Sequence, residues 1–440
     1  MSHYLKSAAL AAAALIAQPA AAQLSDPEHL ITSTVEAGFE QDVALLEAIT
    51  NINSGSHNHD GVREVAALLA PEFAELGFTT EFIDQAHVDR AGHLFAFHEG
   101  DPDATRILLI GHLDTVFEPS SPFQQFTREG DIAIGPGVTD NKGGIIVILS
   151  ALRAMQAAGT LEGANIVVAL TGDEEDAGDP IEQSRAHLIQ AGRWADVALG
   201  FEGLSVLDGR DMGVVARRSS NNWTLTTTGR SGHSSRVFSD YAGYGAIYEM
   251  TRILDAFRRE LPEENLTFNV GFMAGGTPAT VGEDNQSATT VGKNNIIPDS
   301  AVARGDLRTI SQEQSERVAA AMQAIVDDNL PGTDAEISFV FEYPPMSPTD
   351  ANRALLARLN AINADMGLDE MAEFPPAMRG AADISFVAPY TDGLAGMGPN
   401  GGGSHAPGES VDLVSIIRQA QRAAVLMSRL SAEDYPRREN

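Results

Sequence analysis

Three short runs of apolar residues in the first half of the chain constrain its fold most strongly. The runs cover residues 107–110, 166–170 and 197–201, and none of them alternates apolar with polar side chains. Strands of this kind are buried on both faces, which is typical of a parallel sheet with helices on either side. A helix-like segment, residues 144–158, lies between the first two runs. The pattern therefore predicts an α/β fold built on a mostly parallel sheet.

Each predicted strand is followed by side chains that can bind a metal or move a proton. These carboxylate and imidazole side chains are His112, Asp114, Glu174, Glu175 and Glu202. In α/β sheets, binding sites form beyond the carboxyl ends of the strands. Taken one at a time, each of these motifs fits an ordinary structural turn as well as it fits a site. Only their joint occurrence favours a functional site.

Two glycine-rich segments add further candidates. Residues 135–144 contain Asp140 and lead into the predicted helix, and residues 401–405 end in His405. Glycine lets the backbone approach a site closely. A phosphate-binding loop is the alternative for the first segment, but its spacing differs from that of the P-loop and Asp140 stands where an anion would bind. A cation is the more plausible partner of Asp140.

The composition limits how such residues can act. The 440-residue chain contains no Cys, so thiolate nucleophiles and Cys-ligated zinc are excluded, and any metal must be held by His, Asp or Glu. The formal net charge of −32 argues against binding to nucleic acid or to an anionic membrane surface. No Gly-x-Ser-x-Gly motif for a nucleophilic serine is present. Two His and at least three carboxylates form a ligand set suited to paired zinc ions.

The sequence pattern changes near residue 218. From there on the chain alternates strand-like and helix-like stretches: strand 223–228, helix 246–257, strands 266–272 and 300–308, helix 312–329 and strand 336–342. The order β-α-β-β-α-β is the ferredoxin-like arrangement. We therefore predict that residues 218–345 form a second domain. It is inserted into a first, catalytic domain that consists of residues 23–217 and 346–440.

Residues 1–22 are predicted to be a secretory signal peptide. Lys6 precedes an Ala-rich apolar run that ends in Ala20-Ala21-Ala22 before Gln23. The alternative is an Ala-rich terminal helix. The run is shorter than the ~20 residues that span a bilayer. We expect cleavage near Ala22–Gln23 and a secreted or periplasmic protein without a membrane partner.

Five motifs follow one another along the chain: GHLDT (111–115), GPGVTDNKGG (135–144), TGDEE (171–175), GFEG (200–203) and GGGSHAPGE (401–409). In this order and spacing they resemble the motifs of the co-catalytic zinc hydrolases, metallopeptidase family twenty. This group contains glutamate carboxypeptidase, aminoacylase, acetylornithine deacetylase and related dipeptidases. The resemblance covers roughly residues 35–430. Each motif is weak alone, whereas the ordered set is specific.

The resemblance implies a role for each candidate residue. It assigns five ligands to two zinc ions: Asp140 as the bridge, His112 and Glu202 on one ion, and Glu175 and His405 on the other. Glu174 would be the general base that passes a proton from water to the leaving amine, and Asp114 would orient His112. Family members commonly have a cis peptide bond after the bridging Asp, which is expected here at Asp140–Asn141. Cobalt or manganese are possible substitutes for zinc.

The inserted domain resembles the lid and dimerisation domain of the same family. The sequence GRSGH at 229–233 matches a lid motif whose His, here His233, helps to stabilise the tetrahedral oxyanion in the partner subunit's active site. Asn295 and Arg308 match substrate-binding positions, where Arg308 would grip a substrate carboxylate. The resemblance therefore implies a homodimer formed through this domain.

One further stretch matches the family pattern, and two depart from it. RGAAD at 379–383 resembles the family's turn before the last ligand. The sequence departs from the family pattern at Ser234-Ser235-Arg236 and in the segment 277–293, which is longer than usual and is predicted to be a loop. These departures concern substrate choice and leave the ligand set intact.

The motifs together predict a secreted di-zinc metallohydrolase that cleaves an amide bond in a peptide or an N-acyl amino acid. The first expectation is a carboxypeptidase of the glutamate carboxypeptidase kind, which releases a C-terminal amino acid. An aminoacylase-like deacylase and a dipeptidase are the alternatives. A mononuclear aminopeptidase-like site and a non-catalytic binding protein on the same fold are more remote ones, and the intact ligand set argues against the latter.

Overall fold

The computed structural model describes residues 23–282 and 286–436. Its larger lobe is built on a six-stranded sheet with the order β1-β2-β6-β3-β7-β20. Strands β3, β6, β7 and β20 are parallel, whereas β1 and β2 form an antiparallel hairpin at one edge, so the sheet is mixed. The α/β prediction is confirmed, and the three predicted strands are β3, β6 and β7. The strands are β1 (Thr79–Asp84), β2 (Gly92–His98), β3 (Arg106–His112), β6 (Asn165–Thr171), β7 (Val197–Gly200) and β20 (Asp392–Leu394).

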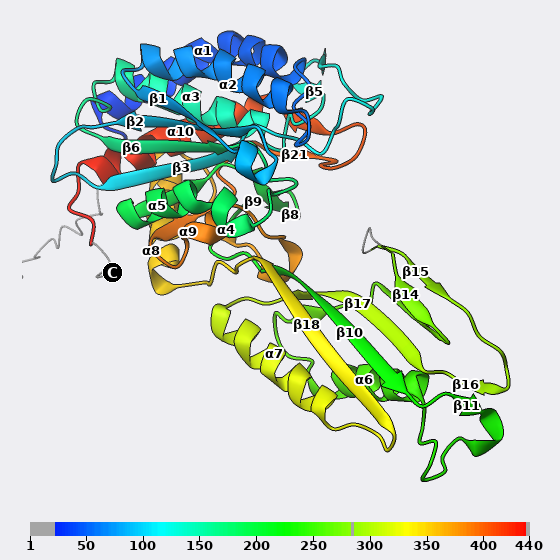
Figure 1. The fold of residues 1–440 in the computed structure, drawn as a ribbon. Coiled ribbons are helices and arrows are strands. Elements are labelled where there is room, and N and C mark those ends of the chain that lie inside the picture. The colour runs from blue at the N-terminus through cyan, green and yellow to red at the C-terminus, as the bar shows by residue number, and fades with distance from the viewer. Residues whose placement is uncertain (1–22, 283–285, 437–440) are drawn as a thin grey trace, which may run out of the picture.

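Helices cover both faces of this sheet, which explains why the predicted strands lack polar alternation (Figure 1). Ile107 and Leu109 of β3 join one core, and Leu108 and Ile110 join the other. The first core lies under α1 (Asp26–Thr50), α2 (His59–Glu75), α3 (Lys142–Ala157) and α10 (Leu413–Ser431). The second lies under α4 (Ile181–Ser184), α5 (Ala186–Trp194) and α9 (Ile384–Val387), while α8 (Asp350–Asp365) packs beside β20.

Local sequence signals mark the ends of the first two helices. Helix α1 begins at Asp26, where Ser25 and Glu28 form a capping box. It ends before the Asn-Ser-Gly-Ser cluster at 53–56, whose residues favour turns. Helix α2 is followed by Gly77, whose φ of +89° is the left-handed conformation that glycine supplies after a helix.

The smaller lobe contains a second, antiparallel sheet with the order β12-β17-β10-β18, in which β13 also pairs with β17. Helices α6 and α7 pack on it and bury a separate core around Trp223 and Phe257. The predicted strand 266–272 is two short strands, because a bulge that contains Gly271 interrupts it. The elements are β10 (Ser220–Gly229), α6 (Ala246–Glu260), β12 (Thr267–Phe268), β13 (Phe272–Gly276), β17 (Ser300–Arg308), α7 (Gln312–Asp327) and β18 (Thr333–Tyr343).

The segment 277–293, predicted as a loop, contains two short strands. Strand β14 (Ala279–Val281) pairs with β15 (Ala288–Thr290), and the hydroxyl groups of Thr280 and Thr289 form a hydrogen bond of 2.9 Å. The loop prediction is wrong here because β-branched side chains that pair across two strands stabilise a hairpin despite the neighbouring Gly and Ser residues.

The chain passes between the two lobes twice, and the two passages are neighbours. Arg217 and Met346 exchange two backbone hydrogen bonds of 2.9 Å, just before β10 and just after β18. The predicted domain boundaries, 218 and 345, lie beside this pair. From there the smaller lobe extends away from the larger one (Figure 1).

Among the described residues, no helix has the length and apolar character needed to cross a membrane. The predicted signal peptide, residues 1–22, lies outside the described residues.

Small sheets complete the two lobes. The remaining strands are β4 (Thr127–Glu129), β5 (Ile132–Ile134), β21 (Gly401–Gly402) and β22 (Ser410–Asp412) in one sheet, β8 (Ser205–Leu207), β9 (Arg210–Gly213) and β19 (Ala372–Glu373) in another, and the pair β11 (Gly232–His233) and β16 (Ile296–Ile297) in the smaller lobe.

Candidate active site

The carboxyl ends of β3 and β6 bring the first candidate residues together. The two strands pair in parallel with His112 opposite Thr171, so the residues that follow them lie side by side. The backbone N–H groups of Glu174 and Glu175 each donate to a carboxylate oxygen of Asp114 at 3.0 Å. The same carboxylate lies 3.3 Å from His112 Nδ1. Asp114 therefore orients His112 and fixes the turn after β6.

Asp140 lies between the two candidate histidines. Its Oδ1 atom is 3.2 Å from His112 Nε2, and its Oδ2 atom is 3.3 Å from His405 Nε2. His405 Nε2 is also 3.1 Å from Glu175 Oε2. The peptide bond Asp140–Asn141 is cis, as the family resemblance implies. Four of the five predicted ligands thus form one continuous set, which we call the metal cluster: His112, Asp140, Glu175 and His405.

The spacing of the donor atoms fits a metal site. The ligand atoms of His112, Asp140 and Glu175 all lie within 4.8 Å of one another. Two ligands that are each ~2.1 Å from one tetrahedral ion lie ~3.4 Å apart. The imidazole nitrogens and carboxylate oxygens of the metal cluster are 3.1 to 3.3 Å apart. The residues present therefore suit metal ions in both composition and spacing.

The carboxylates of the metal cluster attract positive charge strongly. Hydrogen bonds with Asp140 and Glu175 raise the pKa of His405 to about 11. Burial alone would lower the pKa of His112, but hydrogen bonds with Asp114 and Asp140 hold it well above its usual range. Protons on these imidazoles compensate the surrounding negative charge, and a divalent cation supplies the same compensation.

Glu174 lies beside the metal cluster with its carboxyl group unpaired. Among the described residues, none donates a hydrogen bond to its side chain, whereas its backbone is held on both sides. Burial, followed by the nearby Glu202 carboxylate, holds the pKa of Glu174 well above its usual range. A buried carboxyl group of this kind can accept a proton and pass it on.

Glu202, at the end of β7, is held by arginine. Its Oε2 atom accepts a hydrogen bond of 2.6 Å from Arg217 Nη1 and lies 3.7 Å from Arg379 Nη2. Glu202 and His112 line one narrow cavity. Shared ligation of one ion by these two residues stays a prediction. No sequence motif relates Arg217 or Arg379 to Glu202, although Arg379 is the first residue of the RGAAD stretch.

Glu409 is a further residue that shapes the site. Its carboxylate accepts hydrogen bonds from the backbone N–H groups of Gly137, Thr139 and Asp140 at 3.2, 2.8 and 2.9 Å. It therefore fixes the loop that carries Asp140. The sequence signal was its position at the end of the GGGSHAPGE motif, four residues after His405.

The candidates in the smaller lobe lie apart from the metal cluster. His233 and Asn295 are neighbours, because β11 pairs with β16 and the N–H of Ser234 donates to the Asn295 carbonyl at 2.9 Å. Both strands lie at the end of the smaller lobe that is remote from the larger lobe (Figure 1). Arg308 lies at the other end of β17, and its Nε pairs with Asp306 at 3.0 Å. Within the part of the chain that is described, no hydrogen bond or ion pair joins these three candidates to the metal cluster.

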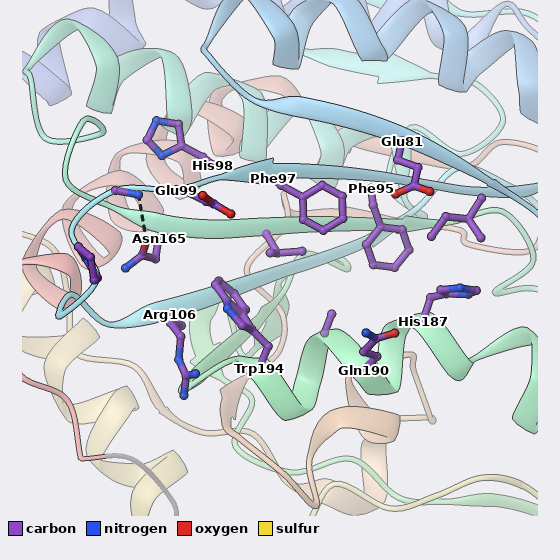
Figure 2. A pocket seen from close by; sticks show the side chains of 15 residues that line it. Glu81, Phe95, Phe97, His98, Glu99, Arg106, Asn165, His187, Gln190 and Trp194 are labelled. Carbon is purple, nitrogen blue, oxygen red and sulfur yellow. Dashed lines mark hydrogen bonds between the residues drawn. The ribbon is translucent and has the colours of Figure 1, made fainter.

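A cavity of about 570 Å³ lies elsewhere in the larger lobe, between α5 and the edge of the sheet that contains β1 and β2. Figure 2 shows Phe95 and Phe97 on the sheet side of this cavity and Trp194 on the helix side. None of the predicted site residues lines it. The metal cluster therefore lies outside this cavity.

A His and carboxylate cluster at the carboxyl edge of an α/β sheet, with an unpaired carboxyl group beside it, defines a metal-dependent hydrolase. The chain matches the model of Peptidase family M20/M25/M40 over residues 108–430 and belongs to this family.

Similar proteins agree with this assignment. Carboxypeptidase G2 of Pseudomonas sp. (strain RS-16) is 26% identical over 448 residues, which cover 98% of this chain and 98% of that protein. Succinyl-diaminopimelate desuccinylase of Xanthomonas oryzae pv. oryzae is 26% identical, covering 83% of this chain and 93% of that protein. The YXEP protein of Bacillus subtilis, a dinuclear metal binding peptidase of family M20, has a TM-score of 0.63 at 15% identity, covering 90% and 99% of the two chains.

Proposed function

We propose that the protein is a di-zinc carboxypeptidase that releases a C-terminal amino acid from a peptide. One observation carries the proposal: Asp140 lies between His112 and His405 at 3.2 and 3.3 Å, with the unpaired carboxyl group of Glu174 beside them. A carboxylate between two histidines suits the bridging of two ions. The similarity to carboxypeptidase G2 over nearly the full length of both chains supports the choice of substrate.

In this proposal Asp140, His112, Glu202, Glu175 and His405 would hold the two ions, with Asp140 as the shared ligand. When bound, paired zinc ions polarise the scissile carbonyl and make water more acidic. Cobalt and manganese suit the same ligands.

Glu174 is the proposed general base. It takes a proton from the water whose oxygen attacks the scissile carbonyl carbon, and it delivers that proton to the amine nitrogen as the carbon–nitrogen bond breaks. Asp114 keeps His112 in the tautomer and orientation that ligation needs.

We also propose that residues 218–345 form a lid through which two subunits dimerise. His233 and Asn295 lie at the end of this lid that is remote from the larger lobe. They therefore suit the active site of a second copy of the chain better than the metal cluster of their own chain. Three aromatic side chains that follow His233 in the sequence are exposed: Phe238 by 57%, Tyr241 by 69% and Tyr248 by 53%. Exposed aromatic patches are typical of protein interfaces. Arg308 would bind the α-carboxylate of the substrate.

Export is the remaining part of the proposal. The Lys6 flank, the apolar run and the small residues before Gln23 support a cleaved signal peptide and a secreted or periplasmic enzyme. Mass spectrometry of the protein recovered from culture medium and periplasm tests this directly, because cleavage predicts an N-terminus at Gln23.

A deacylase is the second candidate function. The desuccinylase relative has the same 26% identity as the carboxypeptidase relative, although it covers less of the chain. Both reactions hydrolyse an amide beside a free carboxylate, so the metal cluster alone does not distinguish them. The two functions differ in the group on the acyl side of the cleaved bond.

A substrate panel tests the proposal. The mature protein is stripped with a chelator, reloaded with zinc, and assayed with peptides bearing free or amidated C-termini and with N-acyl amino acids. We expect cleavage of peptides with a free C-terminus only, no activity without metal, and a fall in kcat of roughly 10²–10⁴-fold in Glu174→Gln.

The exposed residue Glu182 in α4 supplies the control, and Glu182→Gln should match wild type. Cleavage of N-acyl amino acids but not of peptides would favour the deacylase. An active Glu174→Gln enzyme, or zinc-loaded protein without activity on the whole panel, would contradict the proposal.

A further inference from the structure

The second passage between the lobes ends at the proposed catalytic residue. Tyr343 is the last residue of β18, the strand that leads from the smaller lobe back to the larger one. Its hydroxyl group donates a hydrogen bond of 2.7 Å to the backbone carbonyl of Glu174. The two residues are 169 positions apart in the sequence. A strand of the smaller lobe therefore touches the backbone of the residue beside the metal cluster.

The hydroxyl group of Tyr343 is fixed by its surroundings. It accepts a hydrogen bond of 3.0 Å from Arg185 Nη2, and the Tyr343 ring packs edge-on against Phe386 with ring centres 5.0 Å apart. Burial holds the pKa of Tyr343 well above its usual range, so the hydroxyl group keeps its proton and acts as a donor. Its direction toward Glu174 is thus set by an arginine on one side and a ring on the other.

Arg185 in turn is anchored in the larger lobe. It is fully buried, and its Nε donates to Asp383 at 2.7 Å while its Nη1 donates to Asp173 at 2.6 Å. Asp173 also accepts hydrogen bonds from the Ser184 hydroxyl at 2.6 Å and from the N–H of Gly178 at 2.8 Å. A guanidinium between two carboxylates with every group paired forms a rigid support.

The backbone of Glu174 is consequently held from two directions. Its N–H donates to Asp114, which belongs to the metal site, and its C=O accepts from Tyr343, which belongs to the strand of the smaller lobe. No described residue holds the carboxyl group itself. The position of that carboxyl group relative to the metal cluster therefore depends on these two backbone contacts.

We propose that Tyr343, the last residue of β18, is a positioning residue that sets the position of the Glu174 carboxyl group. The inference rests on the proposed function, in which Glu174 is the general base. Arg185 and Phe386 hold the Tyr343 hydroxyl group against the Glu174 carbonyl, so the end of the strand that returns from the smaller lobe fixes the backbone of the proposed base. Proton transfer is efficient only in the placement that the hydrogen bond enforces, since misplacement by about 1 Å can cost 10²-fold in rate.

The test is Tyr343→Phe in the zinc-loaded enzyme, a change that removes one oxygen and keeps the ring on Phe386. We expect kcat to fall roughly 5- to 100-fold while KM changes less than about twofold, because the hydroxyl group that is removed contacts the backbone of Glu174. The zinc content should stay at the wild-type value, because no metal-cluster residue loses a partner.

Tyr435→Phe is the matched control. It also removes a hydroxyl group that donates to an acceptor in the larger lobe, Asp392 Oδ2 at 2.9 Å, but at a place away from the metal cluster. Its kcat should equal that of wild type even if its thermal stability falls. If Tyr343→Phe does not accumulate as folded protein, Phe386→Leu serves instead, because it loosens the Tyr343 ring and keeps the hydroxyl group. This variant should also lower kcat while KM changes little.

The outcomes separate this inference from the proposed function. A Tyr343→Phe enzyme with wild-type kcat, or one in which only KM rises, overturns the positioning role while Glu174→Gln remains inactive. An equal loss of kcat in Tyr435→Phe would also overturn it, since the effect would then follow from a general loss of stability. Full activity of Glu174→Gln would instead remove the proposed function.

Discussion

Arg217 makes two contacts of different kinds, one through its backbone and one through its side chain. Its backbone pairs with Met346 between the lobes, while its buried guanidinium holds Glu202 at 2.6 Å and donates to the Gly380 carbonyl at 2.8 Å. A carboxylate that ligates a metal is commonly oriented by such a partner. Arg217 therefore connects the passage between the lobes to a predicted metal ligand.

Replacing Arg217 by Met should lower the affinity for one of the two zinc ions roughly ten- to a hundredfold, because Glu202 loses the group that orients it. Competition between the protein and a chelator of known affinity measures this without any assay of activity. Arg418→Met, which breaks the 3.0 Å pair with Asp211 elsewhere in the larger lobe, is the control. Unchanged or tighter binding of both ions in Arg217→Met would contradict the expectation.

His93 makes the unfolding free energy depend on pH. It is fully buried, its Nδ1 accepts from the N–H of Gly172 at 3.2 Å, and its Nε2 lies 2.9 Å from the Ser184 carbonyl, which suits neutral imidazole. Burial lowers the pKa of His93 below the ~6.5 of an unfolded chain. The unfolded state therefore binds more protons below that pH, so the contribution of His93 to stability is present above about pH 6.5 and is lost as the pH falls.

Urea unfolding of the metal-free protein at pH 7.5 and 5.5 checks this. The wild-type protein should lose more unfolding free energy between the two pH values than His93→Gln does, since glutamine does not titrate. The exposed residue His187 gives the control, and His187→Gln should follow wild type. Equal pH dependence in wild type and His93→Gln would refute the assignment.

For single residues, the sequence predicts the metal ligands and the proposed base better than it predicts the residues that hold them in position. His112, Glu174 and Glu202 could be found because each follows an apolar run whose end defines the edge of the sheet. Arg217 and Tyr343 could not be found, because they meet their partners 15 and 169 residues away in the chain. Such contacts follow from how the two lobes are placed, and no local pattern encodes that placement.

Among the elements, the loop that carries Asp140 depends most on a single side chain. It lies between β5 and α3, and Glu409 satisfies three of its backbone N–H groups. Burial raises the pKa of Glu409 to about 7. The carboxylate that holds the loop belongs to the segment after His405, so the two glycine-rich segments form one unit.

Removing this acceptor in Glu409→Ala should lower the unfolding free energy of the metal-free protein by about 1–3 kcal/mol, the cost of leaving buried donors unpaired. It should also weaken zinc binding, because Asp140 is no longer fixed. Urea unfolding and chelator competition measure the two effects. Glu182→Ala on the surface should change neither, and an equally stable Glu409→Ala protein would rule out the bracing role.

Element boundaries follow the sequence wherever a run is buried on both faces or ends at a capping residue. Strands β3, β6 and β7 and helix α3 belong to this group. The pattern fails at β1, which lies at the edge of the sheet, and at the hairpin of β14 and β15. Strands at edges bury less apolar surface, so their sequences carry a weaker signal.

For the whole molecule, the predicted dimer can be tested through activity, because His233 lies at the end of the smaller lobe that is remote from the metal cluster of its own chain. If His233 acts in the partner subunit's active site, mixing inactive Glu174→Gln with inactive His233→Ala protein should restore activity. In a mixed dimer, one of the two sites combines an intact Glu174 with an intact His233. Random exchange of subunits makes half of the dimers mixed, so roughly a quarter of the sites become active.

Assays before and after subunit exchange measure this recovery, with light scattering to confirm the size of the particle. Glu174→Gln mixed with Glu174→Ala serves as the control and should stay inactive. Absence of recovery in a mixture that has demonstrably exchanged subunits would place His233 outside the partner's site.

The pairing of Arg217 with Met346 also bears on how a chain like this one changes over time. Because the two ends of the inserted segment meet, the entropic cost of closing the host chain across it grows only with the logarithm of the length of the insert, by about 0.6 kcal/mol for each doubling. All five predicted ligands lie outside the segment. Insertions and deletions between residues 218 and 345 therefore leave the metal-binding framework untouched. The smaller lobe is the part of the molecule in which substrate preference can diverge while the five predicted metal ligands are kept.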